Sequence, residues 1–307
     1  MTELSGAPAM DGVHLATPTA AGVAEYLEIL KPRVMALVVF TGLVGLSLAP
    51  GHLHPVLAAV AVLCIAVGAG SAGAINMWYD RDIDALMRRT ARRPLPTGRM
   101  MPGEALGFGV VLGVGAVVVM GLALNSVAAA LLAMTILFYV FVYTIWLKRR
   151  TPQNIVIGGA AGAFPPIIGW AAATGEIAWG AIALFAIIFF WTPPHFWALS
   201  LSRTDEYAAA GVPMLPVVSG LYETKRQILL YTLVLWPVTV APWLMGVAGD
   251  LYAAGTLLLN AIFTVTAVQV CRDDSDRSAR RMFAFSLLYL FLIFSMLLMD
   301  RAGGNWH

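Results

Sequence analysis

NMWYDRDIDALMRRTARRPLPTGR, residues 76–99, lies between two long apolar runs and holds much of the charge of a chain that has little. Within it, Asn76, Asp80 and Asp84 are spaced four residues apart, which places them along one face of a helix. Oxygen-bearing side chains at this spacing suit Mg²⁺, which completes its octahedron with water and substrate phosphates. Five arginines follow Asp84, and guanidinium groups bind phosphate through paired hydrogen bonds. The stretch therefore indicates a site for a charged phosphate ester.

A simpler interpretation of these charges is that they form the solvated flank of a membrane helix, where arginine often only sets the topology. Composition supports the membrane setting. Hydrophobic residues make up 60% of the chain and charged residues only 12%, against about 25% charged in soluble domains. We therefore predict an integral membrane protein. The net charge of +2 gives no reason to expect nucleic acid as a partner.

Nine apolar segments follow one another almost evenly to the end of the chain, each near the length of about twenty residues that a spanning helix needs. We place them at 34–50, 55–78, 104–123, 126–146, 153–173, 177–200, 228–247, 250–270 and 282–299. This pattern predicts an all-α polytopic membrane protein with one transmembrane domain, residues 25–300. A mobile cytoplasmic tail (1–24) is expected before it and a short tail (301–307) after it.

Lysine and arginine are distributed unevenly among the loops. The turns between spans one and two, three and four, five and six, and seven and eight contain none, whereas the other four loops hold nearly all the positive charge. Positively charged loops remain in the cytoplasm. We therefore predict that the N-terminus and the loops 79–103, 147–152, 201–227 and 271–281 are cytoplasmic.

Prolines and small residues predict how some spans pack. Pro165–Pro166 and Pro193–Pro194 are expected to break two helices at membrane depth. Such breaks are tolerated where the backbone is buried in protein or lines a cavity, and ordinary kinks are the alternative. Pro32 is expected to end a short amphipathic helix that begins at Glu25. Runs of small residues, above all 158–170, predict close approach of helices.

Three further groups lie on the same predicted side as the aspartates. Tyr143 and Lys148 end one span, where they can hold diphosphate oxygens or simply anchor the helix at the interface. His195 lies near the end of another span, where an ionisable group suggests a functional role. A histidine satisfied by local partners is the alternative. Asp205 and Glu206 can supply a second metal site or form a solvated pair.

These motifs together resemble a known family. NMWYDRDIDALM carries the N-x-x-x-D-x-x-x-D signature of UbiA-type intramembrane prenyltransferases, and further stretches look like the haem O synthase branch, the protohaem IX farnesyltransferases. Those stretches are KPR (31–33), RTARRPLP (89–96), YTIWLKR (143–149), GGAAGAFPPIIGW (158–170), PPHFW (193–197) and EYAAAGVPMLPV (206–217). Quinone-type relatives carry a second D-x-x-x-D after the sixth helix, where this chain reads SRTDEY (202–207).

The resemblance implies a nine-helix bundle around a central cavity, capped by cytoplasmic loops, in the inner membrane of a bacterium. It implies that the farnesyl group of farnesyl diphosphate is transferred to a vinyl group of haem b. Water is added, and haem o and diphosphate are the products, as a step toward the haem a of cytochrome oxidase. Haem b is thus a substrate, and Mg²⁺ is the implied cofactor. Implied partners are the bilayer and, as a candidate, a haem a synthase.

Residue roles follow from the same resemblance. Asp80, Asp84 and Asn76 are expected to hold Mg²⁺, with Glu206 as a further candidate ligand, and Lys148 and Tyr143 to act on the diphosphate. The expected substrate-binding residues are Lys31, Arg33, Arg88, Arg89, Arg92, Arg93, His195, Trp197 and Glu206. For His195, axial ligation of haem iron competes with a hydrogen bond donated to a propionate or to backbone freed by the prolines.

Two other functions remain open at this point. A prenyltransferase of the same fold acting on a quinone or other aromatic acceptor would need no iron ligand. The other is a non-enzymatic transporter or haem-handling protein. A transporter would more often show inverted repeats and charges at the bilayer midplane, whereas the charges of this chain gather at one rim.

Overall fold

The computed structural model describes residues 21–273 and 275–303, and within these residues the secondary structure is helical throughout. The helices and continuous helix pairs long and apolar enough to cross a membrane are α3 (Pro55–Tyr79), α5 (Pro102–Ala123), α6 with the π-helix η1 (Ser126–Leu137 and Phe138–Leu147), α7 with α8 (Asn154–Ala163 and Pro165–Thr174), α9 (Trp179–Leu201), α12 (Gly220–Leu244), α13 (Asp250–Arg272) and α14 (Asp276–Ala302). The remaining helices are α1 (Val23–Ile29), α2 (Pro32–Leu48), α4 (Arg81–Leu86), α10 (Thr204–Ala209) and α11 (Leu215–Val218).

The predicted all-α bundle is confirmed. Among the described residues, eight spans are long and apolar enough, and α1 with α2, bent by 54° at their junction, brings the number to nine when the pair is counted as one span. The predicted tails fall largely on residues 1–20 and 304–307, which lie outside the described residues. α12 and α14 begin before the apolar segments predicted at 228 and 282, because their polar first turns are helical as well.

The junction of α1 and α2 is a sharp turn at Lys31. Its backbone has φ of 54°, the left-handed region, and among the described residues no other non-glycine residue has a positive φ. Pro32 begins α2, and a residue before proline is driven out of the right-handed helical region. The predicted helix stop before Pro32 is therefore confirmed, and the turn fixes the direction of the Lys31 side chain.

The two proline pairs differ in their effect. Pro165 interrupts one span for a single residue, Phe164, between α7 and α8, whereas α9 continues through Pro193 and Pro194, so the predicted break there is wrong. Proline removes a backbone donor, yet α9 is held in place by packing against α7, α12 and α14. The Thr192 hydroxyl also donates to the Ile188 carbonyl (2.7 Å). Tertiary packing overrides the local preference for a break.

Glycines allow the central helices to approach closely, as predicted for residues 158–170. A Cβ at Gly169 of α8 would lie 2.1 Å from the Gly42 carbonyl oxygen of α2. On α7, a Cβ at Gly158 would lie 2.1 Å from the Tyr143 ring, and one at Gly159 would lie 2.8 Å from Thr192. α7 is therefore wedged between η1 and α9.

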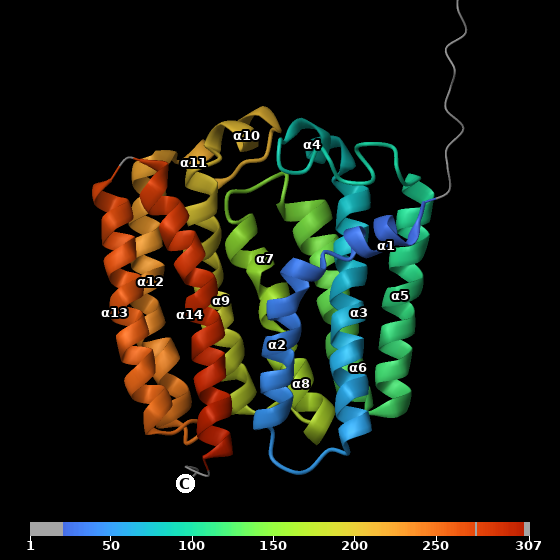
Figure 1. The fold of residues 1–307 in the computed structure, drawn as a ribbon, viewed down its shortest axis with the longest axis vertical. Coiled ribbons are helices and arrows are strands. Elements are labelled where there is room, and N and C mark those ends of the chain that lie inside the picture. Colours follow the sequence, from blue (N-terminus) through green and yellow to red (C-terminus); the bar gives the residue numbers. More distant parts are fainter. Residues whose placement is uncertain (1–20, 274, 304–307) are drawn as a thin grey trace, which may run out of the picture.

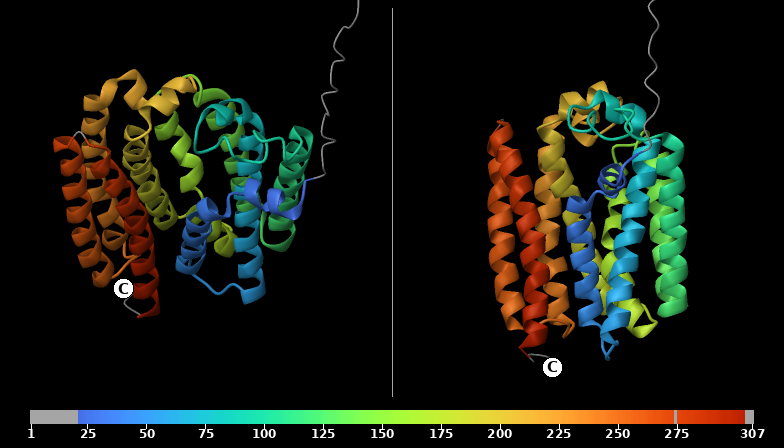
Figure 2. Two further views of the ribbon diagram at one scale, coloured as in Figure 1. Left: turned by 45° about the horizontal axis from the view of Figure 1, so that its top comes forward. Right: turned by 45° about the vertical axis from the view of Figure 1, so that its right-hand side comes forward.

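The short helices gather at one end of the bundle. α4, α10 and α11 lie over this end, and the C-terminal end of α14 lies at the other (Figure 1). Figure 2 shows the same capping segments from two further directions. A small apolar cluster joins Ile83 of α4 and Met87, which follows it, to Tyr207 and Met214 in the α10–α11 segment. Two of the loops predicted to be basic, 79–103 and 201–227, thus form one cap over the helix ends.

Candidate active site

Asn76, Asp80 and Asp84 lie where α3 passes into α4, and they are only 5%, 0% and 3% exposed. The backbone N–H of Asp80 donates to the Asn76 carbonyl (2.9 Å), and that of Asp84 donates to the Asp80 carbonyl (2.8 Å). These bonds between residues four apart continue across the junction, so the spacing seen in the sequence is preserved. The Asn76 amide then donates to the Asp80 carboxylate (2.7 Å).

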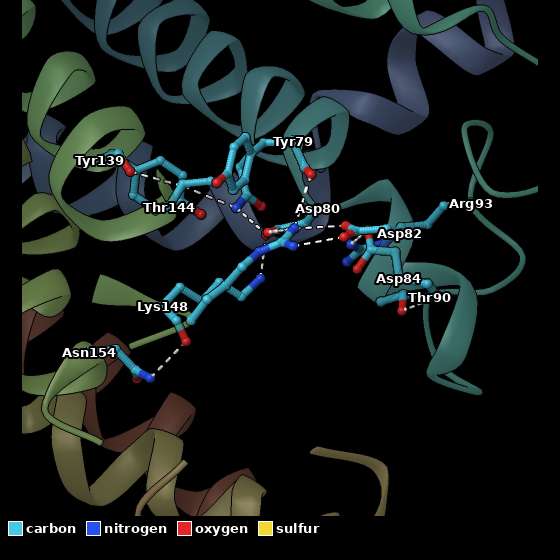
Figure 3. Close-up of polar contacts among 12 residues, drawn as sticks. Tyr79, Asp80, Asp82, Asp84, Thr90, Arg93, Tyr139, Thr144, Lys148 and Asn154 are labelled. Carbon is cyan, nitrogen blue, oxygen red and sulfur yellow. Dashed lines mark hydrogen bonds and ion pairs between the residues drawn. The ribbon is translucent and has the colours of Figure 1, made fainter. Parts of the chain in front are cut away.

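Two basic residues directly after η1 pair with Asp80, and Figure 3 shows Lys148 pointing toward it. The Lys148 ammonium contacts Oδ2 of Asp80, and a guanidinium nitrogen of Arg149 lies 3.5 Å from Oδ1. Asp80 is thus a buried carboxylate held between cations. A buried carboxylate requires cationic partners of this kind. The fold therefore places positive charge directly beside Asp80.

The π-helical geometry of η1 places its polar groups toward α3. The Lys148 N–H donates to the Tyr143 carbonyl (2.9 Å), five residues before it. The Thr144 hydroxyl donates to the Tyr139 carbonyl (2.9 Å), and the same hydroxyl accepts from the Asn76 amide (3.2 Å). π-helical segments are rare and are often found at functional sites.

Lys31 reaches the same group from the N-terminal side. Its ammonium donates to the side-chain oxygen of Asn76 (2.8 Å). The Asn76 amide therefore contacts Lys31, Asp80 and Thr144 at once. Three segments far apart in sequence are joined through one neutral side chain.

Asp84 has its own cation. A guanidinium nitrogen of Arg93 lies 2.6 Å from its carboxylate, and the Thr90 hydroxyl donates to its carbonyl (2.8 Å). The loop that carries Arg93 is tied to α1, because Arg99 contacts Glu25 (3.0 Å) and Glu28 (3.1 Å). The arginine-rich loop is thus folded back over the aspartates.

Arg149 is a site residue that the sequence interpretation assigned only to topology. Besides Asp80, it contacts both carboxylate oxygens of Asp82 at 2.7 Å, and its guanidinium lies 4.8 Å from the Tyr79 ring centre. The Arg149 guanidinium holds the pKa of the Asp82 carboxyl at about 2, below its usual value. Asn154 was also missed; it is fully buried and its amide donates to the Lys148 carbonyl (3.3 Å).

Other predicted residues are less closely tied to this group. Tyr143 packs against Tyr139, with ring centres 5.1 Å apart, and faces α7. Trp197 is 1% exposed and its ring faces Tyr231 of α12. Glu206 lies 3.7 Å from Arg203. Four of the predicted arginines are exposed: Arg33, Arg88, Arg89 and Arg92. The roles predicted for these residues remain predictions.

The donor set fits Mg²⁺ bound through two carboxylates and completed by water and phosphate. Asp80 and Asp84 are buried oxygen donors on successive turns, with the Asn76 amide beside them. Among the described residues, no group of three or more His, Cys, Asp or Glu side chains forms a metal site. The fit therefore rests on Asp80 and Asp84, and Glu206 stays a candidate from sequence alone.

Comparison with known proteins gives a consistent picture. The model of the UbiA prenyltransferase family matches residues 38–294. Protoheme IX farnesyltransferase of Parvibaculum lavamentivorans is 60% identical over 284 residues, covering 91% of this chain and 89% of that protein. The protein of the same name from Rhodopseudomonas palustris is 59% identical over 294 residues, covering 94% of each chain.

Solved structures share the fold at low sequence identity. Digeranylgeranylglyceryl phosphate synthase superposes with a TM-score of 0.76 at 16% identity, covering 91% of this chain and 98% of that one. A UbiA homolog from Archaeoglobus fulgidus bound to DMAPP and Mg²⁺ has a TM-score of 0.65 at 17% identity, covering 89% and 99%. At such identities the likeness establishes the shared architecture.

Proposed function

The chain belongs to the UbiA prenyltransferase family, and we propose that it transfers the farnesyl group of farnesyl diphosphate to a vinyl group of protohaem IX (haem b). Haem o and diphosphate are the products. The geometry that supports this best is the buried Asn76–Asp80–Asp84 group, ringed by Lys31, Lys148 and Arg93 at one end of an apolar bundle. The proteins named protoheme IX farnesyltransferase, at 57–60% identity, favour haem over a quinone as the acceptor.

The substrate fits this division of the molecule. A farnesyl chain is apolar and a diphosphate is highly charged, so both are accommodated where an apolar bundle meets a basic rim. Asp80 and Asp84, oriented by Asn76, would hold Mg²⁺, which neutralises negative charge on the leaving diphosphate. Lys148 and Lys31 already lie on the Asp80–Asn76 pair, so their ammonium groups are positioned for phosphate oxygens next to it.

The reaction then follows from the chemistry of the two organic substrates. The allylic C–O bond breaks and diphosphate leaves with the electron pair, which makes the farnesyl carbon electrophilic. The π electrons of the haem vinyl group form the new C–C bond. Water adds to the carbon beside the macrocycle and loses a proton, which gives the hydroxyethylfarnesyl group. The cap formed by α4, α10 and α11 keeps bulk water from the farnesyl group before that step.

Orientation and partners complete the proposal. The chain is an integral membrane protein, and we place it in the bacterial inner membrane with the capped end in the cytoplasm, because the basic loops lie at that end. A haem a synthase is the proposed recipient of haem o, since the product is an apolar haem that remains in the bilayer.

Membranes containing the protein provide the direct test. Labelled farnesyl diphosphate and Mg²⁺ are added with either haem b or an aromatic quinone precursor. The extracted products are separated, and those that carry the label are identified by mass spectrometry. We expect label in haem o only, and its loss on chelation of Mg²⁺. Label transferred only to the quinone precursor would contradict the proposal.

The arginines of the cap loop are expected to differ in importance. Arg93 contacts Asp84, whereas its neighbour Arg92 has an exposed side chain. We expect Arg93→Ala to raise the apparent KM for farnesyl diphosphate by about tenfold, in line with loss of a charged hydrogen bond. Arg92→Ala should change it by less than about threefold, as for an exposed charge. Steady-state kinetics on the two purified variants measures both KM values. Equal changes in KM would indicate that Arg93 only sets the topology.

A further inference from the structure

His195 is enclosed on both faces of its ring. Trp191 stacks on one side with ring centres 4.3 Å apart, and Phe283 of α14 stacks with its ring centre 4.7 Å away. Phe196 meets the ring edge-on at 5.3 Å. The side chain is 7% exposed. Because the faces are covered, the imidazole can act on a ligand only through the nitrogen atoms at its edge.

One of these nitrogens is already engaged. Nδ1 of His195 lies 2.6 Å from the hydroxyl oxygen of Ser286, on α14. The same hydroxyl oxygen lies 2.6 Å from the carbonyl oxygen of Phe283. The Trp191 indole N–H donates to the Ser286 carbonyl (2.9 Å). Trp191, which stacks on His195, is thus bonded to the same serine that contacts Nδ1.

The Ser286 hydroxyl sets the tautomer of His195. A carbonyl oxygen can only accept a hydrogen bond, and a serine hydroxyl has one hydrogen to donate. At an O···O distance of 2.6 Å, that hydrogen must lie between Ser286 and Phe283. Ser286 therefore accepts from His195, so the hydrogen of the neutral imidazole is on Nδ1. The lone pair is on Nε2.

Nε2 is the free edge of the ring. Among the described residues, the contact through Nδ1 is the one hydrogen bond of this side chain. Nε2 has no such partner, and it is not fully enclosed by protein. A charged imidazolium is disfavoured between aromatic rings, away from water. Nε2 therefore has no hydrogen to donate to a propionate, and its lone pair can accept a hydrogen bond or ligate a metal.

This part of α9 adjoins the cap. Phe196 packs against the cluster that contains Ile83 and Met87, on either side of Asp84. Thr192, one turn before Phe196, lies against Gly159 of α7, and Gly158 beside it lies against Tyr143. The turn of α9 that carries His195 is therefore packed, through Phe196, against the segment that carries Asp84.

We propose that Ser286 is a positioning residue that holds His195 in the Nδ1–H tautomer, so that Nε2 ligates the iron of the haem substrate. This rests on the proposed function. Ligating histidines commonly donate their second N–H to a fixed acceptor, which orients the ring and strengthens the bond to the metal. Ligation is therefore favoured over donation of a hydrogen bond to a propionate. The third interpretation, a histidine satisfied by local partners, is met at Nδ1 by Ser286, and haem binding at Nε2 distinguishes it from ligation.

The tautomer is tested first without haem. Protein with ¹⁵N-labelled histidine is measured by NMR, and the His195 signals are identified by their loss in His195→Gln. We expect a protonated Nδ1 and an unprotonated Nε2 in the native chain, and a mixture of tautomers in Ser286→Ala. A protonated Nε2 in the native chain would overturn the proposal, whether or not the enzyme acts on haem.

Ligation is then tested with haem b added to purified protein in lipid nanodiscs, read from the Soret band. His195→Ala should shift the band, and added imidazole should restore it. Ser286→Ala should weaken haem binding by about 10- to 100-fold, while Ser286→Thr, which keeps the hydroxyl, should retain most of it. Ser295→Ala is the matched control, because Ser295 is on the same helix and its hydroxyl also bonds a backbone carbonyl (Phe291, 2.8 Å).

The outcomes separate the two levels of the proposal. An unchanged Soret band in His195→Ala at full haem occupancy would exclude ligation. Native haem affinity in Ser286→Ala would exclude the role of Ser286. If the native chain bound no haem but had the expected tautomer, the proposed acceptor would be wrong, and ligation of haem iron with it.

Discussion

Asp80→Asn is expected to lower the turnover of farnesyl diphosphate by on the order of 10²-fold or more, with insertion into the membrane unchanged. Asp80 is fully buried and its carboxylate meets Asn76, Lys148 and Arg149. Asparagine keeps the shape of the side chain and removes the charge that would anchor Mg²⁺. Asp84→Asn should have an effect of the same order, since Asp84 is the second buried carboxylate.

Product formation per mole of purified protein, with farnesyl diphosphate and haem b, is the measurement. Asp276→Asn is the matched control: Asp276 is 55% exposed and lies 3.8 Å from Arg280 at the start of α14, so its loss should leave turnover within about twofold. Asn76→Ala should be milder than either aspartate change, because a neutral amide orients its neighbours and carries no charge. Near-native product from Asp80→Asn or Asp84→Asn would remove the metal-site interpretation.

The sequence was most informative where a pattern repeats locally. Asn76, Asp80 and Asp84 could be placed together from their spacing alone, because helical hydrogen bonds continue from α3 into α4. The uneven distribution of basic residues likewise predicted which loops share one end. Both inferences depend on neighbours within a few turns or on simple counting, and neither needs knowledge of tertiary contacts.

Contacts between distant segments could not be inferred in this way. Lys31 meets Asn76 across 45 residues from a turn with left-handed backbone, and Lys148 meets Asp80 across 68 residues at the end of a π-helix. Neither feature has a reliable sequence signal. The pairing of His195 with Ser286 spans 91 residues and involves an ordinary serine in an apolar helix.

The wrong inference at Pro193 and Pro194 has a related cause. Proline predicts a helix break from local geometry, but α9 is surrounded by α7, α12 and α14. The contacts of Arg149 were missed because its local sequence already had a simpler explanation. Its neighbours Lys148 and Arg150 make the local pattern that of a topology signal, and only the fold shows that Arg149 contacts the aspartates.

Lys148→Ala is expected to lower kcat by about 10²-fold. The Lys148 ammonium contacts Asp80 directly, and its side chain is 18% exposed. When farnesyl diphosphate binds beside Asp80, this cation lies where negative charge develops as the C–O bond breaks, so its effect should be greater on kcat than on KM. Arg150→Ala is the matched control, because Arg150 is exposed two residues away and should retain near-native kinetics.

A purely structural role for Lys148 would give a different result. Removing one partner of a buried carboxylate destabilises a protein, but Asn76 and Arg149 would still contact Asp80. Thermal unfolding of the variant in nanodiscs is therefore measured beside the kinetics. A lower unfolding temperature with kcat unchanged in the folded protein would show that Lys148 only neutralises Asp80. We expect a large loss of kcat at a near-native unfolding temperature. This result would place the ammonium group on the leaving diphosphate.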